Sequence, residues 1–353
     1  MKNVYWIGCL VQLVLPTLTM MGQTYLPQNY PQTEIANEIL QARIFLPDAE
    51  KGFYRGTRFD WAGVIGSLEY KGHSYFGPFF EKFDPSVEDV VIGNPILAGI
   101  NSAAAGPVEE FIGADGTALG YSEAKPGETF CKIGVGSLRK SDNAAYSSYT
   151  NYEIADGGKR TSRSGPGWIE FTQEVHCGSG YAYRYTKTIR LLKNEPVMEI
   201  EDQLVNLGKK AIETNVYDHN FLSIDHAPTG PSIVISFPFS PRARQDMGGL
   251  GEIRGKELVF PKDLRGSDTF YTELAGFGNN VDDYQIRVEN RKTGAGVVIT
   301  GDQTLVNIGV WAVRTVVAPE PYIHLNIPAG HDFRWKYTYR FYTGSASASS
   351  PAK

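Results

Sequence analysis

The residue types that could do chemistry in this chain are histidines, carboxylates and aromatic rings. Its 353 residues include 6 histidines, 39 aspartates and glutamates, 20 tyrosines, 18 phenylalanines and 5 tryptophans. Imidazole and carboxylate groups serve as general acids and bases, and aromatic rings pack against the apolar faces of ligands. The inventory favours acid–base chemistry on a neutral polar ligand that stacks on rings.

Motifs of several other chemistries are missing from the sequence. There is no Gly-x-x-x-x-Gly-Lys-Ser/Thr phosphate loop, no Gly-x-Gly-x-x-Gly between a strand and a helix, no Gly-x-Ser-x-Gly elbow and no His-Glu-x-x-His. No Cys-x-x-Cys pair or Cys/His cluster has zinc spacing. We therefore expect neither nucleotide chemistry nor serine hydrolysis, no metal site and no cofactor.

Composition describes a globular protein with many turns. The hydrophobic fraction is 42% and the charged fraction 21%, values that exclude a disordered chain. The formal net charge of −5 gives no basis for a nucleic-acid partner. Glycine occurs 38 times, well above the typical ~7%, and glycine turns between aromatic and β-branched runs argue against a helical protein.

The N-terminus resembles a targeting signal. Lys2 precedes an apolar run at 4–21 that is broken by Pro16, which predicts a secretory signal peptide over 1–22 and a secreted or periplasmic protein. The alternative is an N-terminal membrane anchor, but the run is short for one and contains Gln12. No later stretch is apolar enough to cross a membrane, so no membrane contact is expected after cleavage.

The elements that would position reactive groups are predicted to be β-strands. Alternating apolar and polar residues separated by turns predict strands at 63–70, 73–80, 169–175, 181–192, 197–204, 211–223, 284–289, 296–300, 312–317 and 333–342. One face of the long strand carries Tyr181, Tyr183, Tyr185, Lys187 and Ile189. One short helix is predicted around Glu34–Ala42. Strands linked by short turns favour a large antiparallel sandwich or barrel.

Domain organisation follows from the absence of a linker. The length alone suggests about two domains, but no break in the strand pattern divides the chain. We predict a single domain over 23–344, with a low-complexity, disordered tail at 345–353. Cys131 and Cys177 remain after processing and could pair in an oxidising compartment, although the sequence leaves open whether their Cα atoms are close enough.

Several segments together resemble the galactose mutarotase (aldose 1-epimerase) superfamily. The central ones read GYAYRYTKTIRLL, MEIEDQLVNLG and YDHNFLSID, and the C-terminal ones GDQTLVNIGVWAVRTVVAPEPYI and IPAGHDFRWKYTYRF. FCKIGVGSLRK resembles the segment that carries a family histidine and glycines. The likeness spans roughly Gly63 to Tyr342. It implies an all-β antiparallel supersandwich with a concave face that binds a mono- or oligosaccharide.

The resemblance implies a catalytic pair. His219 matches the family's catalytic histidine and Glu320 its catalytic glutamate. Exchange of anomers needs a base for the proton of the anomeric hydroxyl and an acid for the ring oxygen, which we expect Glu320 and imidazolium His219 to provide with nearly ordinary pKa values. Period two places Tyr217, His219 and Phe221 on one strand face. The alternatives are a structural histidine and a surface carboxylate at a strand end.

Five further residues are candidates for binding the sugar. Arg55 and Arg58 resemble an early family arginine, and Asp282 an aspartate that holds sugar hydroxyls, although Asp283 beside it leaves the register open. Trp311 could stack on a sugar ring or belong to the core. Lys132 stands where the family has a second histidine, and a lysine there would favour a substrate carboxylate such as that of a uronic acid.

A metal site is the least favoured of these readings. His226 and His219 could share an ion, but seven residues separate them, a spacing that lies on no simple shared face of a strand.

Three functions remain open. The first is a sugar 1-epimerase, the second a non-catalytic carbohydrate-binding protein, and the third a polysaccharide lyase acting on uronates, with Lys132, Arg55 and Arg58 as the cations that such a lyase needs. The sequence does not identify the sugar or the oligomeric state.

Overall fold

The computed structural model describes residues 29–79, 104–113 and 115–344, so the predicted signal peptide and C-terminal tail lie outside the described residues. Within these ranges the chain forms twenty-three β-strands, two short 3-10 helices and no α-helix. Every strand pair is antiparallel. The prediction of an all-β antiparallel fold is confirmed. No helix of the described residues is long and apolar enough to span a membrane.

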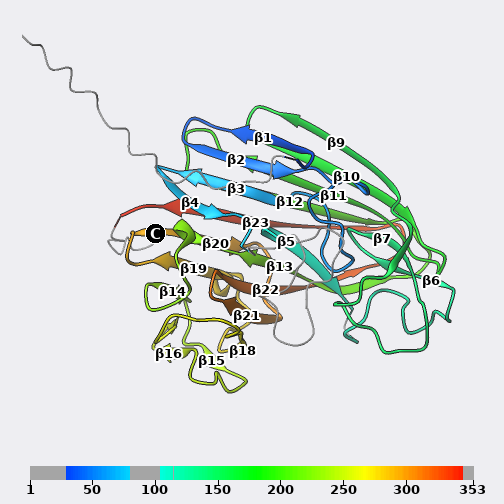
Figure 1. The fold of residues 1–353 in the computed structure, drawn as a ribbon. Helices are drawn as coiled ribbons and strands as arrows, with labels where there is room; N and C mark the ends of the chain where they lie inside the picture. Colours follow the sequence, from blue (N-terminus) through cyan, green and yellow to red (C-terminus); the bar gives the residue numbers. More distant parts are fainter. Residues whose placement is uncertain (1–28, 80–103, 114, 345–353) are drawn as a thin grey trace, which may run out of the picture.

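The strands form four sheets (Figure 1). In spatial order, the ten-stranded sheet contains β16 (Glu252–Arg254), β17 (Glu257–Val259), β14 (Ile233–Ser236), β19 (Gln285–Asn290), β20 (Ala295–Gly301), β23 (Asp332–Tyr342), β12 (Val197–Asn206), β11 (Ala182–Leu191), β10 (Trp168–His176) and β9 (Lys159–Gly165). The six-stranded sheet contains β15 (Arg242–Ala243), β18 (Phe270–Ala275), β21 (Asn307–Val313), β22 (Val316–Ile327), β13 (Ile212–Phe221) and β5 (Gly106–Ile112).

Two smaller sheets and two 3-10 helices complete the described fold. The four-stranded sheet contains β1 (Gln32–Ala36), β2 (Leu40–Phe45), β3 (Ile65–Tyr70) and β4 (His73–Phe76). The three-stranded sheet contains β6 (Thr129–Lys132), β7 (Gly136–Arg139) and β8 (Glu153–Asp156). The helices are η1 (Ile224–His226) and η2 (Val281–Asp283).

Period-two alternation accounts for the central strands. On β11, Tyr183, Tyr185, Lys187 and Ile189 are buried while Arg184 is exposed, because successive side chains of a strand point to opposite faces. Other strands of the same ten-stranded sheet bury large rings such as Trp335 and Tyr337 on β23, and the six-stranded sheet supplies further core residues.

Two predicted elements are wrong. The segment 34–42 forms the hairpin of β1 and β2 and not a helix, because the Asn37 side chain accepts hydrogen bonds from the Ile39 and Leu40 amides and closes a turn. Segment 312–317 contains a turn between β21 and β22, where Val313 pairs with Val316, and so is not one strand.

A disulfide joins the ten-stranded and three-stranded sheets. Cys131 on β6 bonds to Cys177, which directly follows β10, with their Cα atoms 5.8 Å apart. The structure thus answers the pairing that the sequence left open.

The core beneath β5 and β13 is unusually acidic. Asp60, Glu109, Asp202 and Asp218 are all buried there, with Lys187 as their shared cation. The Lys187 ammonium contacts Glu109 and lies 2.8 Å from Asp60. Burial raises the pKa of Asp60 and Glu109 and raises that of Asp202 and Asp218 to about 7. The folded protein therefore holds protons here that the unfolded chain would lose.

Asp218 shows how the bound proton fits the hydrogen bonding. The Tyr339 hydroxyl lies against both Asp218 and the side-chain oxygen of Asn220, the latter at 2.7 Å. One hydroxyl has one proton to donate. When Asp218 is protonated, it donates to Tyr339, and Tyr339 can donate to Asn220, so both contacts of the Tyr339 hydroxyl can be hydrogen bonds.

We expect these acids to make the fold less stable as pH rises from 4 toward about 7 and above. The pKa values of Asp202 and Asp218 are about 7 in the folded protein, against an ordinary value of 3.8 for aspartate. Between these values the folded protein binds more protons than the unfolded chain, so its free energy of unfolding falls as pH rises. Asp218→Asn should flatten this dependence, because the amide can donate as the protonated acid does. The measurement is the thermal midpoint between pH 5 and pH 8.5.

The exposed Asp332→Asn on β23 is the matched control and should keep the wild-type slope. A thermal midpoint that rises with pH across the window, in both wild type and Asp218→Asn, would contradict a protonated acidic core.

Candidate active site

A cavity of about 410 Å³ lies on the six-stranded sheet. Five strands of this sheet contribute side chains to it: Glu110 from β5, Tyr217, His219 and Phe221 from β13, Glu320 and Tyr322 from β22, Trp311 from β21 and Tyr271 from β18. The predicted shared face of Tyr217, His219 and Phe221 is confirmed, since all three line this cavity.

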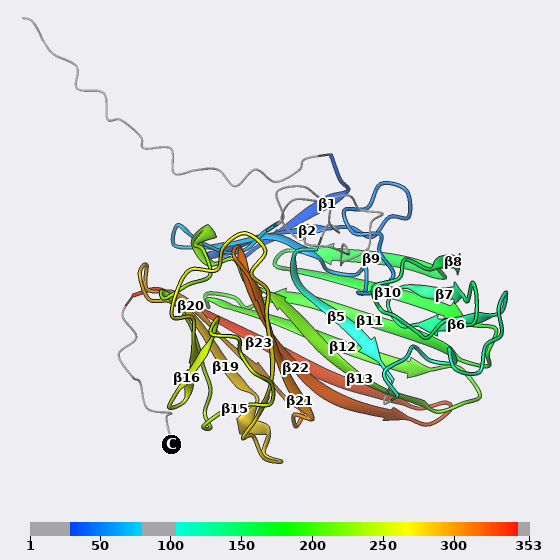
Figure 2. The ribbon, with the colours of Figure 1, turned by 60° about the horizontal axis from the view of Figure 1, so that its bottom comes forward.

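Strand register brings the reactive groups together. Tyr217 pairs with Glu110 on one side and with Tyr322 on the other, and Figure 2 shows β5, β13 and β22 side by side. Two residues further along the same antiparallel register, His219 lies opposite Glu320. The His219 Nε2 and Glu320 Oε1 atoms are 3.1 Å apart.

Two prolines open the strand ladder at this point. Pro319 and Pro321 flank Glu320 inside β22, an internal strand of the sheet, and have no N–H to give β13. The Asn220 side-chain amide donates to the Asp218 and Pro319 carbonyl oxygens at 3.0 Å each, and the first of these bonds stands in for the N–H that Pro321 lacks. A side-chain donor thus supplies two hydrogen bonds to the backbone where the prolines interrupt the ladder.

Glu320 lies in the middle of this strand. The alternative of a surface carboxylate at a strand end is wrong, since β22 continues to Ile327 and Glu320 is 4% exposed. Gly309 of β21 is its cross-strand partner. A Cβ atom at Gly309 would lie 2.8 Å from Glu320 Oε2, so the missing side chain makes room for the carboxyl.

Aromatic rings surround the His219 imidazole. It stacks on Phe221 with the ring centres 3.8 Å apart and meets Phe59 and Trp311 edge-on. Its Nδ1 atom is buried and has no hydrogen-bond partner among the described residues. The Glu320 carboxyl is the polar group that holds this ring.

The pair is neutral in character. Burial raises the pKa of Glu320 to about 8, while burial and the nearby Arg58 charge hold the pKa of His219 well below its ordinary value. The expectation of nearly ordinary pKa values for His219 and Glu320 is wrong. At neutral pH the two groups hold one proton between them, with the carboxyl favoured as its site.

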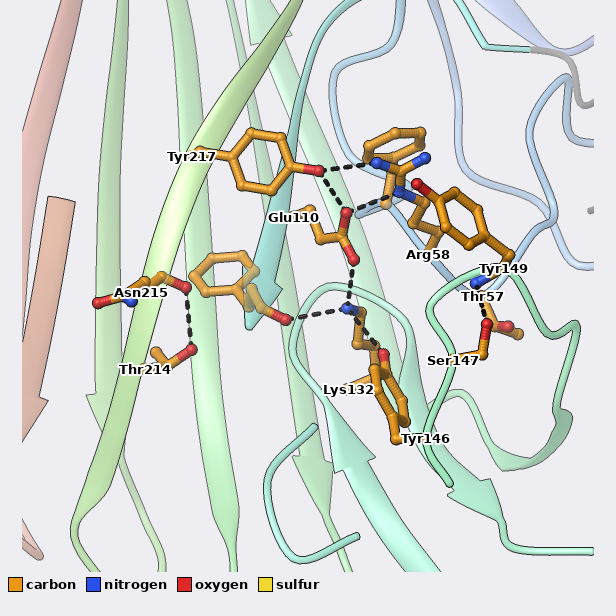
Figure 3. Close-up of polar contacts among 12 residues, drawn as sticks. Thr57, Arg58, Glu110, Lys132, Tyr146, Ser147, Tyr149, Thr214, Asn215 and Tyr217 are labelled. Carbon is orange, nitrogen blue, oxygen red and sulfur yellow. Dashed lines mark hydrogen bonds and ion pairs between the residues drawn. The ribbon is translucent and has the colours of Figure 1, made fainter. Parts of the chain in front are cut away.

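A second carboxylate in the cavity is fully charged. Burial alone would raise the pKa of Glu110, but the Lys132 and Arg58 charges hold it below its ordinary value. Arg58 Nε lies 2.7 Å from Glu110, and the Tyr217 hydroxyl also contacts it (Figure 3). Arg58 also donates to Tyr217 at 3.0 Å, so the cluster fixes one edge of the cavity.

Lys132 does not line the cavity. It is 1% exposed, and its ammonium lies 3.2 Å from Glu110, 2.9 Å from the Phe111 carbonyl and 3.2 Å from the Tyr146 hydroxyl (Figure 3). The predicted direct contact with a substrate carboxylate is not what this geometry offers, because three protein oxygens already occupy the ammonium. Lys132 acts on the site through the charge of Glu110.

The remaining predicted residues divide between the cavity and other places. Arg58 and Trp311 line it. Arg55 is half-buried outside the cavity lining, and Asp282 is exposed in η2. His226 lies in η1, and no group of three or more potential metal ligands in the described ranges is arranged to hold an ion.

The cavity residues that the sequence analysis missed include two pairs of different kinds. Tyr322 stands two places after Glu320, so period two could have found it. Glu110 is the second of two adjacent glutamates in an apolar strand. Because successive side chains point to opposite faces, such a strand places one glutamate on each face. Tyr149 and Tyr271 gave no local signal, because nothing in their neighbourhoods marks them as cavity residues.

Comparison with known proteins identifies the fold. No family model matches the sequence, and no curated protein sequence matches it. A Synechocystis protein of solved structure gives a TM-score of 0.52 at 9% identity, covering 92% of this chain and 100% of its own. A GalM/aldose epimerase homologue from C. elegans gives 0.52 at 13%, covering 88% and 98%. Galactose 1-epimerase from Lactobacillus acidophilus gives 0.50 at 8%, covering 89% and 94%.

These similarities confirm the predicted resemblance at the level of the fold. The chain has the antiparallel β-sandwich fold of galactose mutarotase-like proteins, and its sequence is 8–13% identical to the three structures above.

The contact between Gly309 and Glu320 gives a test of the site. Gly309→Ala should displace the Glu320 carboxyl, and a shift of about 1 Å costs on the order of 10²-fold in rate for a reacting group. Gly157→Ala is the matched control, since nothing lies within 4 Å of a Cβ atom there. Ligand turnover and thermal midpoints are measured for both. Equal turnover by the two variants would contradict a role for this close approach.

Proposed function

We propose that this protein is an aldose 1-epimerase-like isomerase that uses Glu320 and His219 as its acid–base pair. The observation that carries the proposal is the 3.1 Å contact between His219 Nε2 and Glu320 Oε1 inside a cavity walled by aromatic rings. The fold shared with a galactose 1-epimerase supports it. A sugar has an apolar ring face and a rim of hydroxyls, which suits aromatic walls with a few fixed polar groups.

The mechanism uses the single proton of the pair. In the neutral form, Glu320 gives its proton to the sugar's ring oxygen as the bond from that oxygen to the anomeric carbon breaks. His219 takes the proton of the anomeric hydroxyl, and an aldehyde forms. After the aldehyde rotates, imidazolium His219 returns a proton to the aldehyde oxygen while carboxylate Glu320 accepts one from the former ring oxygen. The ring closes as the other anomer, and the pair regains its starting state.

This scheme reverses the starting roles expected from the sequence. Ordinary pKa values would make Glu320 the first base and His219 the first acid, whereas the raised pKa of Glu320 makes it the first acid. Each group plays both roles over one cycle in either scheme, since ring closure is the reverse of ring opening.

A uronate lyase is less well supported by the same cavity. Such an enzyme needs a cation to neutralise the substrate carboxylate, and Lys132 lies behind Glu110 while Arg58 is paired with Glu110. The arrangement favours a neutral sugar.

We further propose that the protein works outside the cytoplasm. The apolar N-terminal run supports this, and the disulfide between Cys131 and Cys177 suits an oxidising compartment.

Polarimetry on freshly dissolved aldoses tests the catalytic pair. Wild type should speed the approach to anomeric equilibrium, and Glu320→Gln and His219→Ala should each lose about 10²–10⁴-fold. The control is His324→Ala. His324 is exposed on β22, the strand that also carries Glu320, and its variant should keep wild-type rates. Binding of sugar without any acceleration across hexoses, pentoses and uronates would refute the epimerase and would indicate a carbohydrate-binding protein.

The pH profile tests the shared proton. After subtraction of the uncatalysed rate, kcat/KM should be flat through neutral pH and fall above pH about 8, where Glu320 loses the proton that it donates. It should fall on the acid side only well below pH 6.5, because His219 must be neutral to accept a proton. An alkaline limb near pH 6.5 would indicate a histidine of ordinary pKa as the acid and would refute the neutral pair.

A further inference from the structure

Two exposed tyrosines stand in the lining of the cavity. Tyr149 and Tyr271 are each 43% exposed, whereas His219 and Glu320 in the same lining are 3% and 4% exposed. Large apolar surfaces that remain in water beside a pocket commonly mark where a ligand rests. The cavity is therefore graded, with the reactive pair at its floor and two rings at its mouth.

The two rings come from different parts of the fold. Tyr271 is on β18 directly opposite Trp311 of β21, and its ring approaches Gly309, above which Glu320 also lies. Tyr149 belongs to the segment between β7 and β8, and the Arg58 guanidinium lies 4.8 Å from its ring centre. Figure 3 shows the Tyr149 ring beside Arg58. Both exposed rings therefore have close neighbours in the protein, Arg58 for Tyr149 and Gly309 for Tyr271.

Each ring has a hydroxyl residue as a close neighbour in the lining. Ser148 precedes Tyr149, and Thr269 stands two places before Tyr271 on the approach to β18. Both walls of the mouth thus offer a flat apolar surface and a hydroxyl that can donate and accept hydrogen bonds. A flat apolar surface beside a hydroxyl suits a sugar unit, so the mouth of the cavity offers a second surface of this kind, apart from the floor.

We propose that Tyr149 and Tyr271 form a subsite for a second sugar unit, so that the preferred substrate is the reducing end of an oligosaccharide. This rests on the proposed function. Ring opening needs a free anomeric hydroxyl, so the sugar at the floor must be the reducing terminus, and the rest of the chain must leave through the mouth. A monosaccharide at the floor would leave both rings in water.

The test compares sugars that share a reducing unit. Polarimetry gives kcat/KM for glucose and for the reducing disaccharides maltose and cellobiose, and the same for galactose and a reducing galactobiose. In wild type at least one disaccharide should exceed its monosaccharide by about fivefold to tenfold, the size expected of one well-placed aromatic contact. Tyr149→Ala and Tyr271→Ala should bring this ratio close to one, and the two Tyr→Phe variants should retain it.

Ile39→Ala is the matched control, because Ile39 is similarly exposed at 39% but lies outside the cavity lining. It should keep the wild-type ratio. Acceleration of monosaccharides with a ratio near one in wild type and in all variants would overturn the subsite while leaving the epimerase intact.

Binding separates the two proposals when no turnover is seen. Quenching of tryptophan fluorescence, to which Trp311 in the lining contributes, gives affinities for the same sugars. Tighter binding of a disaccharide that depends on Tyr149 and Tyr271 would support the subsite even if the epimerase fails. Equal affinity for both sizes of sugar, or no binding of either, would overturn it.

Discussion

The pairing of β13 between β5 and β22 is the constraint on which the rest of the structure depends. A strand presents alternate side chains to opposite faces, and here both faces carry ionisable groups. Tyr217 and His219 face the cavity while Asp218 and Asn220 face the core. The same holds for Glu110 and Glu109 on β5. Because a slip by one residue exchanges the faces, a single register determines the chemistry on both sides of the sheet.

The two faces handle buried charge differently. On the cavity side Glu110 is held ionised by Lys132 and Arg58, which fixes a charged edge beside a neutral acid–base pair. On the core side the carboxyls outnumber their lysine, and their pKa values rise instead. Low dielectric surroundings favour either close pairing or neutralisation of a charge. In the candidate site, paired cations thus hold the fixed charge of Glu110, and burial keeps the proton on Glu320.

Sequence reasoning reached the strands more securely than the side chains. Alternation found most central strands, because each has one buried face, and the placement of His219 and Glu320 in one cavity followed from a family resemblance. It failed at 34–42, where a single Asn37 turn outweighs helix propensity, and at Lys132, whose partner Glu110 is 22 residues away. Asp282 and Tyr271 show the same limit: which distant strands lie side by side decides what a residue touches, and local pattern does not contain that.

The prolines of β22 also bear on how the chain finds this register while folding. The Asn220 amide supplies hydrogen bonds at the gap that Pro319 and Pro321 create. If β22 slid by two residues against β13, one proline would face the Val216 or the Leu222 carbonyl, to which the Asn220 amide does not donate, and each orphaned buried group costs about 1–3 kcal/mol. Misaligned pairings that would bury the same apolar side chains are thereby penalised. The two prolines therefore favour the register of β22 against β13 that places His219 opposite Glu320.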